Sequence, residues 1–310
     1  MMKKNVILDK IGRLDKVLSE KLDDYSRTQI VKLIESAAVR ESISGKVLTK
    51  SYKVETKMEV IVDFNCVKSE EQTIEAKNIP LDIIFEDEFL IVLNKPKGMV
   101  VHPGAGLEQD TLVHALKYHC GNNLSDINPE RAGIVHRLDK DTAGLMLAAK
   151  NNKVHQLLSK MFSEHSIERH YRAICYGLFR ERAGEINGPI ARDPANRMRM
   201  AILPFGREAL TYFKVIDEYR RFSLLDLRLK TGRTHQIRVH LEAINHPILG
   251  DEVYTSNSYQ RLCLDFLKGQ CLYSANVRFI HPITGEELYF EIDEPEFFSE
   301  CKKYLALNNM

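Results

Sequence analysis

The chain lacks cysteine pairs at the spacing that metal sites or redox motifs require. Its six cysteines are scattered, and no Cys-x-x-Cys occurs. Paired cysteines at that spacing are typical of zinc sites and thioredoxin-like motifs, whereas isolated cysteines behave as small apolar side chains. We therefore expect no disulfide and no bound metal. The cysteines are Cys66, Cys120, Cys175, Cys263, Cys271 and Cys301.

Long apolar runs are also missing. None of the 310 residues lies in an apolar stretch near the length of a membrane span. The apolar residues 6–8 are too few, and too soon followed by Asp9 and Lys10, for a signal peptide. There is no Walker-type phosphate loop and no dinucleotide fingerprint. These absences predict a cytoplasmic protein without membrane contact and without a cofactor.

A strong excess of one charge is absent as well, since the formal net charge is +1. Two segments nevertheless differ from this average. Residues 26–57 contain seven basic and three acidic side chains, and residues 228–240 contain four basic side chains, two histidines and no acid. Such local patches can neutralise phosphates on an otherwise neutral protein. A solvated surface face has the same composition.

Length and hydrophobic periodicity predict two domains. In residues 5–66, Leu14, Val17 and Leu18 recur at helical spacing, a second helix follows Ser26, and short strands come after it. We expect a small N-terminal α/β module over residues 5–66, a polar linker over 67–80, and a larger domain over 81–310.

The larger domain is dominated by short strands, predicted at residues 83–85, 89–93, 171–175, 210–215 and 222–229. One helix is clear after Asn151, with an apolar stripe from Val154 to Phe162, and a second is expected from Thr234 to Ile244. Strands without regular βαβ alternation predict an α+β fold, with a mixed, largely antiparallel sheet and flanking helices.

The segment most suggestive of chemistry is residues 136–144, His-Arg-Leu-Asp-Lys-Asp-Thr-Ala-Gly. Because short apolar runs flank it, we expect a hairpin whose tip carries Asp139. Loops held by a rigid sheet are frequent sites of catalytic groups. A solvated turn with surface ion pairs has the same residue content.

Three other segments have a similar character. Residues 95–103, Lys-Pro-Lys-Gly-Met-Val-Val-His-Pro, follow a strand and form either a loop that presents Lys95 and His102 or an ordinary basic turn. Tyr171 opens a strand, as packing or as a base-stacking platform. Residues 230–240 join a strand to a helix whose first turn offers free N–H groups to an anion.

Together these segments resemble the RluA/RluD-type pseudouridine synthases over about residues 80–295. The matching positions, in order, are residues 95–103, 136–144, Tyr171, 232–240 (Gly-Arg-Thr-His-Gln-Ile-Arg-Val-His), 246–251 and 281–286. Ala143 stands where the family usually has Ser, and residues 272–274 read Leu-Tyr-Ser where Leu-His-Ala is more frequent.

The resemblance implies that the protein isomerises uridine to pseudouridine in RNA, after flipping the base out of the RNA. Most relatives act on large-subunit (23S) ribosomal RNA or its precursor particles, with transfer RNA as the alternative. It implies catalytic roles for Asp139, Tyr171 and Arg238. Asp139 would act as nucleophile at ribose carbon 1 or as base at carbon 2, and both routes stay open. Arg238 would keep it ionised as a bidentate partner, and Tyr171 would stack on the uracil.

The resemblance also implies substrate-binding residues around this group. Ile237 would cap the base, Thr142 would support the site, and Arg137 would fill the space that the flipped base vacates. Phosphate groups would be held by three more side chains. These are Lys95, His102 and Arg233.

The first domain resembles the small RNA-binding module of the ribosomal protein S-four type. The usual glycine before Val39 is replaced by alanine, and Lys57-Met58 stands in place of Gly-Asp. The Arg-Leu-Asp run at residues 13–15 looks like part of the catalytic motif, but we give it no catalytic role. The residues expected to contact RNA are Arg13, Ser26, Arg27, Arg40 and Lys46.

Two other classes of function also fit parts of the sequence. The chain could be a non-catalytic RNA-binding or ribosome-assembly factor, against which the complete set of Asp139, Tyr171 and Arg238 argues. A small-molecule nucleoside hydrolase is disfavoured by the RNA-binding module and the basic patches. The partner is therefore expected to be RNA, and the protein is expected to be a monomer.

Overall fold

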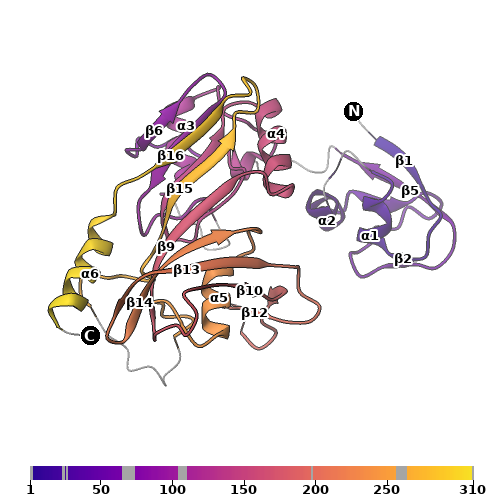
Figure 1. Ribbon diagram of the computed structural model, residues 1–310. Helices are drawn as coiled ribbons and strands as arrows, with labels where there is room; N and C mark the ends of the chain where they lie inside the picture. The colour runs from indigo at the N-terminus through magenta and orange to yellow at the C-terminus, as the bar shows by residue number, and fades with distance from the viewer. Residues whose placement is uncertain are drawn as a thin grey trace. The chain divides into compact units, whose positions relative to one another are not determined.

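The computed structural model describes residues 3–22, 25, 27–64, 74–103, 110–196, 198–255 and 264–308, without the side chains of residues 27–29 and 32. The chain forms two compact units, Met1–Thr73 and Ile74–Met310 (Figure 1). The division lies within residues 67–80, the predicted linker, of which residues 67–73 fall outside the described part. Each unit has a hydrophobic core of its own.

The described residues of the first unit form a three-stranded antiparallel sheet, a separate two-stranded one and two helices. The sheet has the order β1-β5-β3, and its core includes Leu8, Leu18 and Val60. The strand β1 was not predicted, because only Val6 and Leu8 of its six residues are buried and the apolar signal is short. The elements are β1 (Lys3–Leu8), β2 (Gly12–Arg13), α1 (Leu14–Ser19), α2 (Arg27–Glu35), β3 (Val39–Glu41), β4 (Lys53–Val54) and β5 (Met58–Asp63).

The second unit is built on one large sheet. Within its described residues, nine strands join in the order β10-β13-β14-β9-β15-β8-β7-β6, with β16 beside β15. Only the β15–β8 pairing is parallel, which confirms the prediction of a mixed, largely antiparallel sheet. The strands are β6 (Asp82–Glu86), β7 (Leu90–Lys95), β8 (Ala143–Ala149), β9 (Glu168–Tyr176), β10 (Ala183–Asn187), β13 (Leu210–Tyr219), β14 (Phe222–Leu229), β15 (Leu272–Ile280) and β16 (Glu287–Glu291).

Helices cover this sheet (Figure 1). The helix α4 begins after Asn151, whose side chain accepts the Val154 N–H, and it packs Val154 and Leu158 against β8. The helix α5 begins at Gln236 rather than at Thr234, because His235 adopts a left-handed backbone conformation with φ 57°. The remaining elements are α3 (Leu112–Cys120), η1 (Pro129–Arg131), α4 (Asn152–Ser163), β11 (Ile190–Arg192), β12 (Met200–Ile202), α5 (Gln236–Ala243) and α6 (Glu296–Leu307).

The hairpin predicted around residues 136–144 is only half present. Its second arm is β8, but residues 132–135 make a single bridge, from Ile134 to Ala148. The reason is competition for the edges of β8: β7 occupies one edge along its whole length, and β15 occupies the start of the other. The turn that carries Asp139 is therefore anchored by a sheet, not by a two-stranded ribbon.

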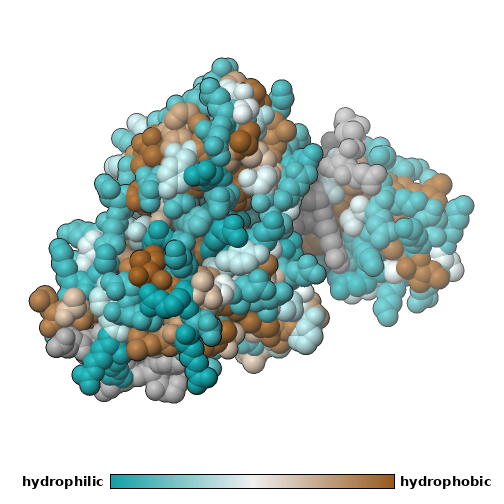
Figure 2. Space-filling model, viewed as in Figure 1, coloured by the Kyte–Doolittle hydropathy of each residue, from teal (hydrophilic) through white to brown (hydrophobic). Residues whose placement is uncertain are grey.

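The surface in view in Figure 2 is mainly hydrophilic, with separate apolar patches. Across the described residues, no helix has the length and the apolar content that a membrane crossing requires.

Candidate active site

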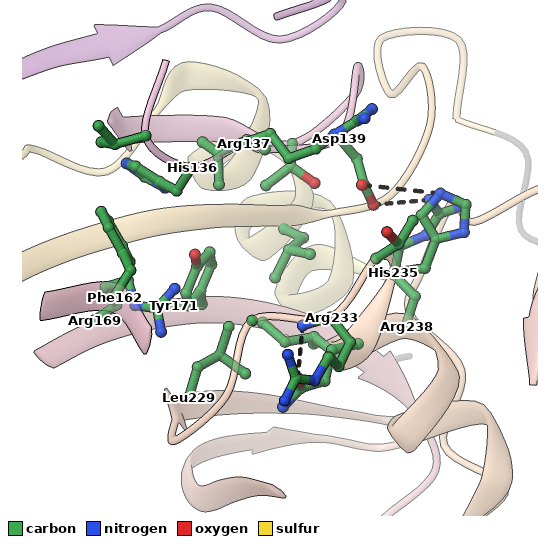
Figure 3. Close-up of a pocket in the computed structure, with 18 of the residues that line it drawn as sticks. His136, Arg137, Asp139, Phe162, Arg169, Tyr171, Leu229, Arg233, His235 and Arg238 are labelled. Carbon is green, nitrogen blue, oxygen red and sulfur yellow. Dashed lines mark hydrogen bonds and ion pairs between the residues drawn. The ribbon is translucent and has the colours of Figure 1, made fainter. Parts of the chain in front are cut away.

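A pocket of about 450 Å³ opens in the second unit (Figure 3). It is formed where the turn before β8, the strand β9 and the start of α5 meet. The pocket brings together three of the predicted segments, since its lining includes Asp139, Tyr171 and Arg238. Residues more than sixty positions apart in the sequence thus share one cavity.

The Asp139 carboxylate is held by an arginine from the other wall of this pocket. Arg238 Nη1 donates a hydrogen bond to Asp139 Oδ2 over 2.9 Å. The expected pair is present, but it is joined by this single bond and is not bidentate, because Nε and Nη2 of Arg238 donate to Asp251. The Asp139 side chain is 19% exposed and that of Arg238 is 7% exposed. The opposite charges are in hydrogen-bond contact, and partial burial strengthens their attraction.

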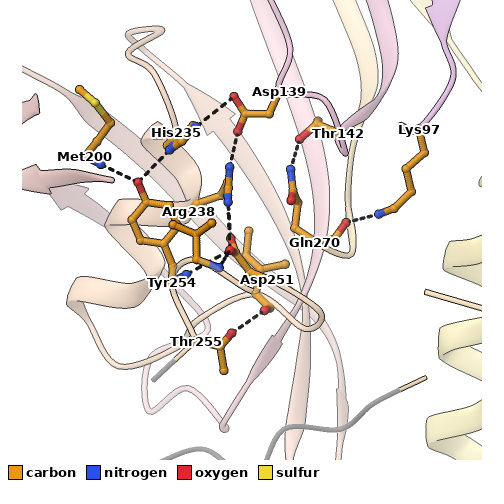
Figure 4. A network of polar contacts seen from close by, with 12 residues as sticks. Lys97, Asp139, Thr142, Met200, His235, Arg238, Asp251, Tyr254, Thr255 and Gln270 are labelled. Atoms are coloured by element: carbon orange, nitrogen blue, oxygen red, sulfur yellow. Dashed lines mark hydrogen bonds and ion pairs between the residues drawn. The ribbon is translucent and has the colours of Figure 1, made fainter. Parts of the chain in front are cut away.

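Asp251 holds Arg238 from the opposite side (Figure 4). Its carboxylate accepts from Arg238 Nε over 2.6 Å and from Nη2 over 3.0 Å. It also accepts the backbone N–H groups of Val253 and Tyr254. These two carboxylates hold the pKa of Arg238 above its ordinary value, although burial acts in the opposite direction. Asp251 lies in the matching segment 246–251 of the sequence analysis, which assigned it no role.

His235 and Tyr254 lie next to the Asp139 carboxylate. The Tyr254 hydroxyl accepts the Met200 N–H over 2.8 Å and lies 2.8 Å from His235 Nδ1. Burial raises the pKa of Tyr254 to about 12, so this hydroxyl stays protonated. Burial lowers the pKa of His235, which favours the neutral imidazole. His235 Nε2 lies 3.8 Å from Asp139 Oδ1, beyond hydrogen-bond distance.

Aromatic and apolar side chains line another part of the pocket. Tyr171 is 5% exposed, and burial raises the pKa of its phenol. Ser274, the residue in the position where the family more often has alanine, lies opposite Tyr171 on the neighbouring strand β15. Ile237, Leu229 and Leu272 complete this part of the lining. A flat, partly aromatic ring fits between such side chains.

Three further residues expected to bind substrate also line the pocket: Thr142, Arg137 and Arg233. Thr142 is buried, accepts a hydrogen bond from Gln270 Nε2, and donates its backbone N–H to Asp139 O. Arg137 is exposed. Arg233 is half-buried and donates from Nε to the Glu208 carbonyl.

Lys95 and His102 correct the sequence analysis, which expected them to hold phosphates. Lys95 is 0% exposed, and its Nζ donates to the carbonyls of Pro96, Met99 and Lys140 over 2.8, 2.9 and 3.0 Å. Burial lowers its pKa to about 7. His102 is buried, and burial lowers its pKa to about 4. Neither side chain reaches the pocket; Lys95 instead fastens the loop after β7 to the turn that carries Asp139.

The residues expected to bind RNA in the first unit are only partly described. Arg13, Arg40 and Lys46 are exposed. Arg13 pairs with Asp15 over 3.0 Å, and Asp15 is buried. Ser26 and the Arg27 side chain lie outside the described residues.

Solved structures share the fold. One is human RNA pseudouridylate synthase domain containing 4, with a TM-score of 0.58 and 25% identity over 73% of this chain and 93% of that chain. Human RNA pseudouridylate synthase domain containing 1 gives a TM-score of 0.57 at 24% identity, over 71% of this chain and 86% of that chain.

Curated sequences show a closer relationship. The chain is 41% identical to ribosomal large subunit pseudouridine synthase D of Zymomonas mobilis, over 96% of this chain and 95% of the relative. It is 42% identical to an uncharacterized RNA pseudouridine synthase of Aquifex aeolicus, over 94% and 93%. Residues 89–243 match the family model of RNA pseudouridylate synthases. The chain therefore belongs to the RNA pseudouridylate synthase family and is an isomerase of uridine in RNA.

Proposed function

We propose that this enzyme converts uridines of large-subunit ribosomal RNA into pseudouridine, and that Asp139 is the group on which the reaction depends. One observation carries this assignment: Asp139 is the only carboxylate among the described residues that line the pocket, and Arg238 is hydrogen-bonded to it. The substrate class is supported by the names of relatives such as that from Zymomonas mobilis.

The chemistry requires an ionised carboxylate. The bond between ribose carbon 1 and N1 of uracil breaks, and the base turns. Carbon 5 then bonds to carbon 1, a proton leaves carbon 5, and N1 takes one up. Asp139 serves this sequence either as nucleophile at carbon 1 or as base at carbon 2. In both cases the charge on Arg238 stabilises the form of Asp139 that reacts.

The uracil ring is proposed to stack on Tyr171 with Ile237 on its other side. Thr142 supports the backbone at Asp139, since its N–H bonds to the Asp139 carbonyl. Arg137 is exposed at the edge of the pocket, in a position suited to fill the space left by the flipped base. Arg233 is proposed to contact a phosphate near the flipped nucleotide.

The first unit is proposed to be an S-four-like RNA-binding module, with the second unit as the catalytic domain. Arg13, Arg40 and Lys46 are exposed, as phosphate contacts must be. We also propose that the enzyme acts as a cytoplasmic monomer.

The test is tritium release from carbon 5 of uridine in ribosomal RNA transcripts, with transfer RNA transcripts as a second substrate. We expect Asp139→Asn to lower the single-turnover rate by about 10³-fold or more, because asparagine can be neither nucleophile nor base. Asp141→Asn removes a carboxylate from the same turn that does not line the pocket, and it should keep the rate within about threefold.

Release from transfer RNA alone would contradict the proposed substrate. An Asp139→Asn enzyme that reacts at the wild-type rate would contradict the assignment of Asp139. No release by the wild type from either RNA would contradict the proposed function as a whole.

A further inference from the structure

Arg169 is a second arginine in the catalytic pocket, and the chemistry described above does not use it. It lies on β9 two residues before Tyr171, so both side chains emerge on the same face of the sheet. Figure 3 shows the two side chains beside each other in the pocket. Arg169 is 6% exposed.

The guanidinium of Arg169 has no counter-ion among the residues that the structure describes. It makes no hydrogen bond or ion pair with any described residue, and its Nε is buried without a partner. Its neighbour is the Phe162 ring, whose centroid lies 5.2 Å from Arg169 Cζ. Arg238 in the same pocket is hydrogen-bonded to two carboxylates. A buried cation without such a partner destabilises the folded protein, which points to a ligand that supplies the missing acceptor.

The backbone near Arg169 leaves room for this side chain. Gly232 faces the guanidinium, and a Cβ atom at that position would lie 3.1 Å from Arg169 Nη1. Phe162 from α4 covers the other side. The cation is thus enclosed, while Tyr171 and the pocket lie next to it.

The reaction supplies an anion at this place. When the bond from ribose carbon 1 to N1 breaks, its electron pair stays on the base and is delocalised over O2 and O4, whichever role Asp139 takes. We propose that Arg169 is a catalytic residue that donates hydrogen bonds to a carbonyl oxygen of the uracil and stabilises the departing uracil anion. This inference rests on the proposed function. A preorganised donor aimed at developing charge acts mainly in the transition state.

The experiment replaces Arg169 with methionine, which removes the charge and keeps an apolar chain on Phe162, and with lysine, which keeps a charge. Arg278→Met is the matched control. Its Cζ also lies 5.2 Å from an aromatic centroid, that of Tyr289, but it is exposed and paired with Glu287. The measurements are the single-turnover rate of tritium release, the Kd for RNA as a function of salt, and the Tm.

We expect Arg169→Met to lower the rate about 10²- to 10³-fold while the Kd and its salt dependence stay close to those of the wild type. The Tm should equal that of the wild type or exceed it, because the variant removes a buried cation that lacks a partner. Arg169→Lys should recover part of the rate, and Arg278→Met should behave as the wild type. In RNA that contains 5-fluorouridine, the base leaves more readily as an anion. The rate of Arg169→Met should then lie closer to the wild-type rate. For this substrate, chromatography of the rearranged nucleoside measures the rate.

Three results would overturn the inference while the wild type is active. One is an unchanged rate for Arg169→Met. Another is weaker RNA binding, with a slope of log affinity against log salt concentration that is smaller by about one, and an unchanged rate at saturation. This result would make Arg169 a phosphate contact. The third is a rate loss accompanied by a lower Tm, which would make it a packing residue. If the wild type releases no tritium from any RNA, the proposed function fails first and the inference falls with it.

Discussion

At the scale of single residues, the orientation of Arg238 depends on a buried partner, Asp251. In Asp251→Asn, two backbone N–H groups and the Arg238 guanidinium would bond to a neutral amide oxygen in place of a carboxylate. The amide N–H atoms of the new asparagine would point at other hydrogen-bond donors. We expect unfolding free energy to fall by about 3 kcal/mol and the single-turnover rate to fall about tenfold or more, as Arg238 shifts toward Asp139. Urea titration and tritium release measure the two effects. Wild-type stability in this variant would contradict the structural role of Asp251.

A second residue-scale prediction concerns pH. His136 Nε2 accepts the Leu147 N–H, and burial lowers its pKa to about 3 from an ordinary value of 6.5. Below pH 6.5 the unfolded chain binds a proton that the folded chain does not. His136 therefore contributes stability above pH 6.5 that is lost as the pH falls toward 3, by about 1.4 kcal/mol per pH unit.

The variant His136→Phe keeps the ring against Phe162, which stacks on His136 at 4.5 Å, and removes the titrating group. Urea titrations at pH 7 and pH 5 should show a stability difference that is smaller than in the wild type, even though the variant is less stable at pH 7 because the Leu147 N–H loses its acceptor. An equal pH dependence in the two proteins would contradict the assignment.

At the scale of elements, the contact between β8 and β15 depends on Gly144. Its φ is +109°, and a Cβ atom there would lie 2.2 Å from the Ser274 carbonyl oxygen, on the parallel partner strand. We expect Gly144→Ala to cost about 4 kcal/mol or more, because the clash is with backbone that cannot move aside. Gly98→Ala is the control: φ is +85°, but no atom lies within 4 Å, so only conformational strain of about 1 kcal/mol remains. Equal costs, measured by urea titration, would contradict the steric explanation.

The elements also show how far sequence reasoning extends. Periodicity predicted α4 and the strands β6, β7, β9, β13 and β14, because each of these elements shows an apolar pattern within its own residues. It missed β1, β10, β15 and β16 and overextended the hairpin before β8, because strand pairing depends on which neighbouring segments occupy the edges of a strand. The resemblance led to the Asp139–Arg238 pair that the structure contains. Motif position did not reveal that Lys95 is enclosed by three carbonyls or that Arg169 has no counter-ion, because these depend on contacts between distant segments.

At the scale of the whole molecule, the two units have separate hydrophobic cores. We therefore expect RNA binding by the first unit to be separable from catalysis by the second. The double variant with Arg40→Glu and Lys46→Glu reverses two exposed charges of the first unit. We expect it to weaken RNA binding about tenfold or more at moderate salt, since each phosphate contact adds to the salt-dependent affinity, and to leave the single-turnover rate at saturating enzyme unchanged. Charge reversal at the exposed Arg278 and Lys303 of the second unit is the control. Unaltered binding by the first variant would contradict an RNA-binding role for this unit.

The unbroken sheet of the second unit has a consequence for how the enzyme loses activity on heating. Asp139 lies in the turn before β8, and Arg238 lies in α5, which follows β14. The strands β15 and β9 lie between β8 and β14 in the sheet. The sheet thus fixes the separation of the two segments that carry these residues. We therefore expect thermal inactivation to coincide with cooperative melting of the sheet, without an earlier phase in which activity disappears while the sheet persists.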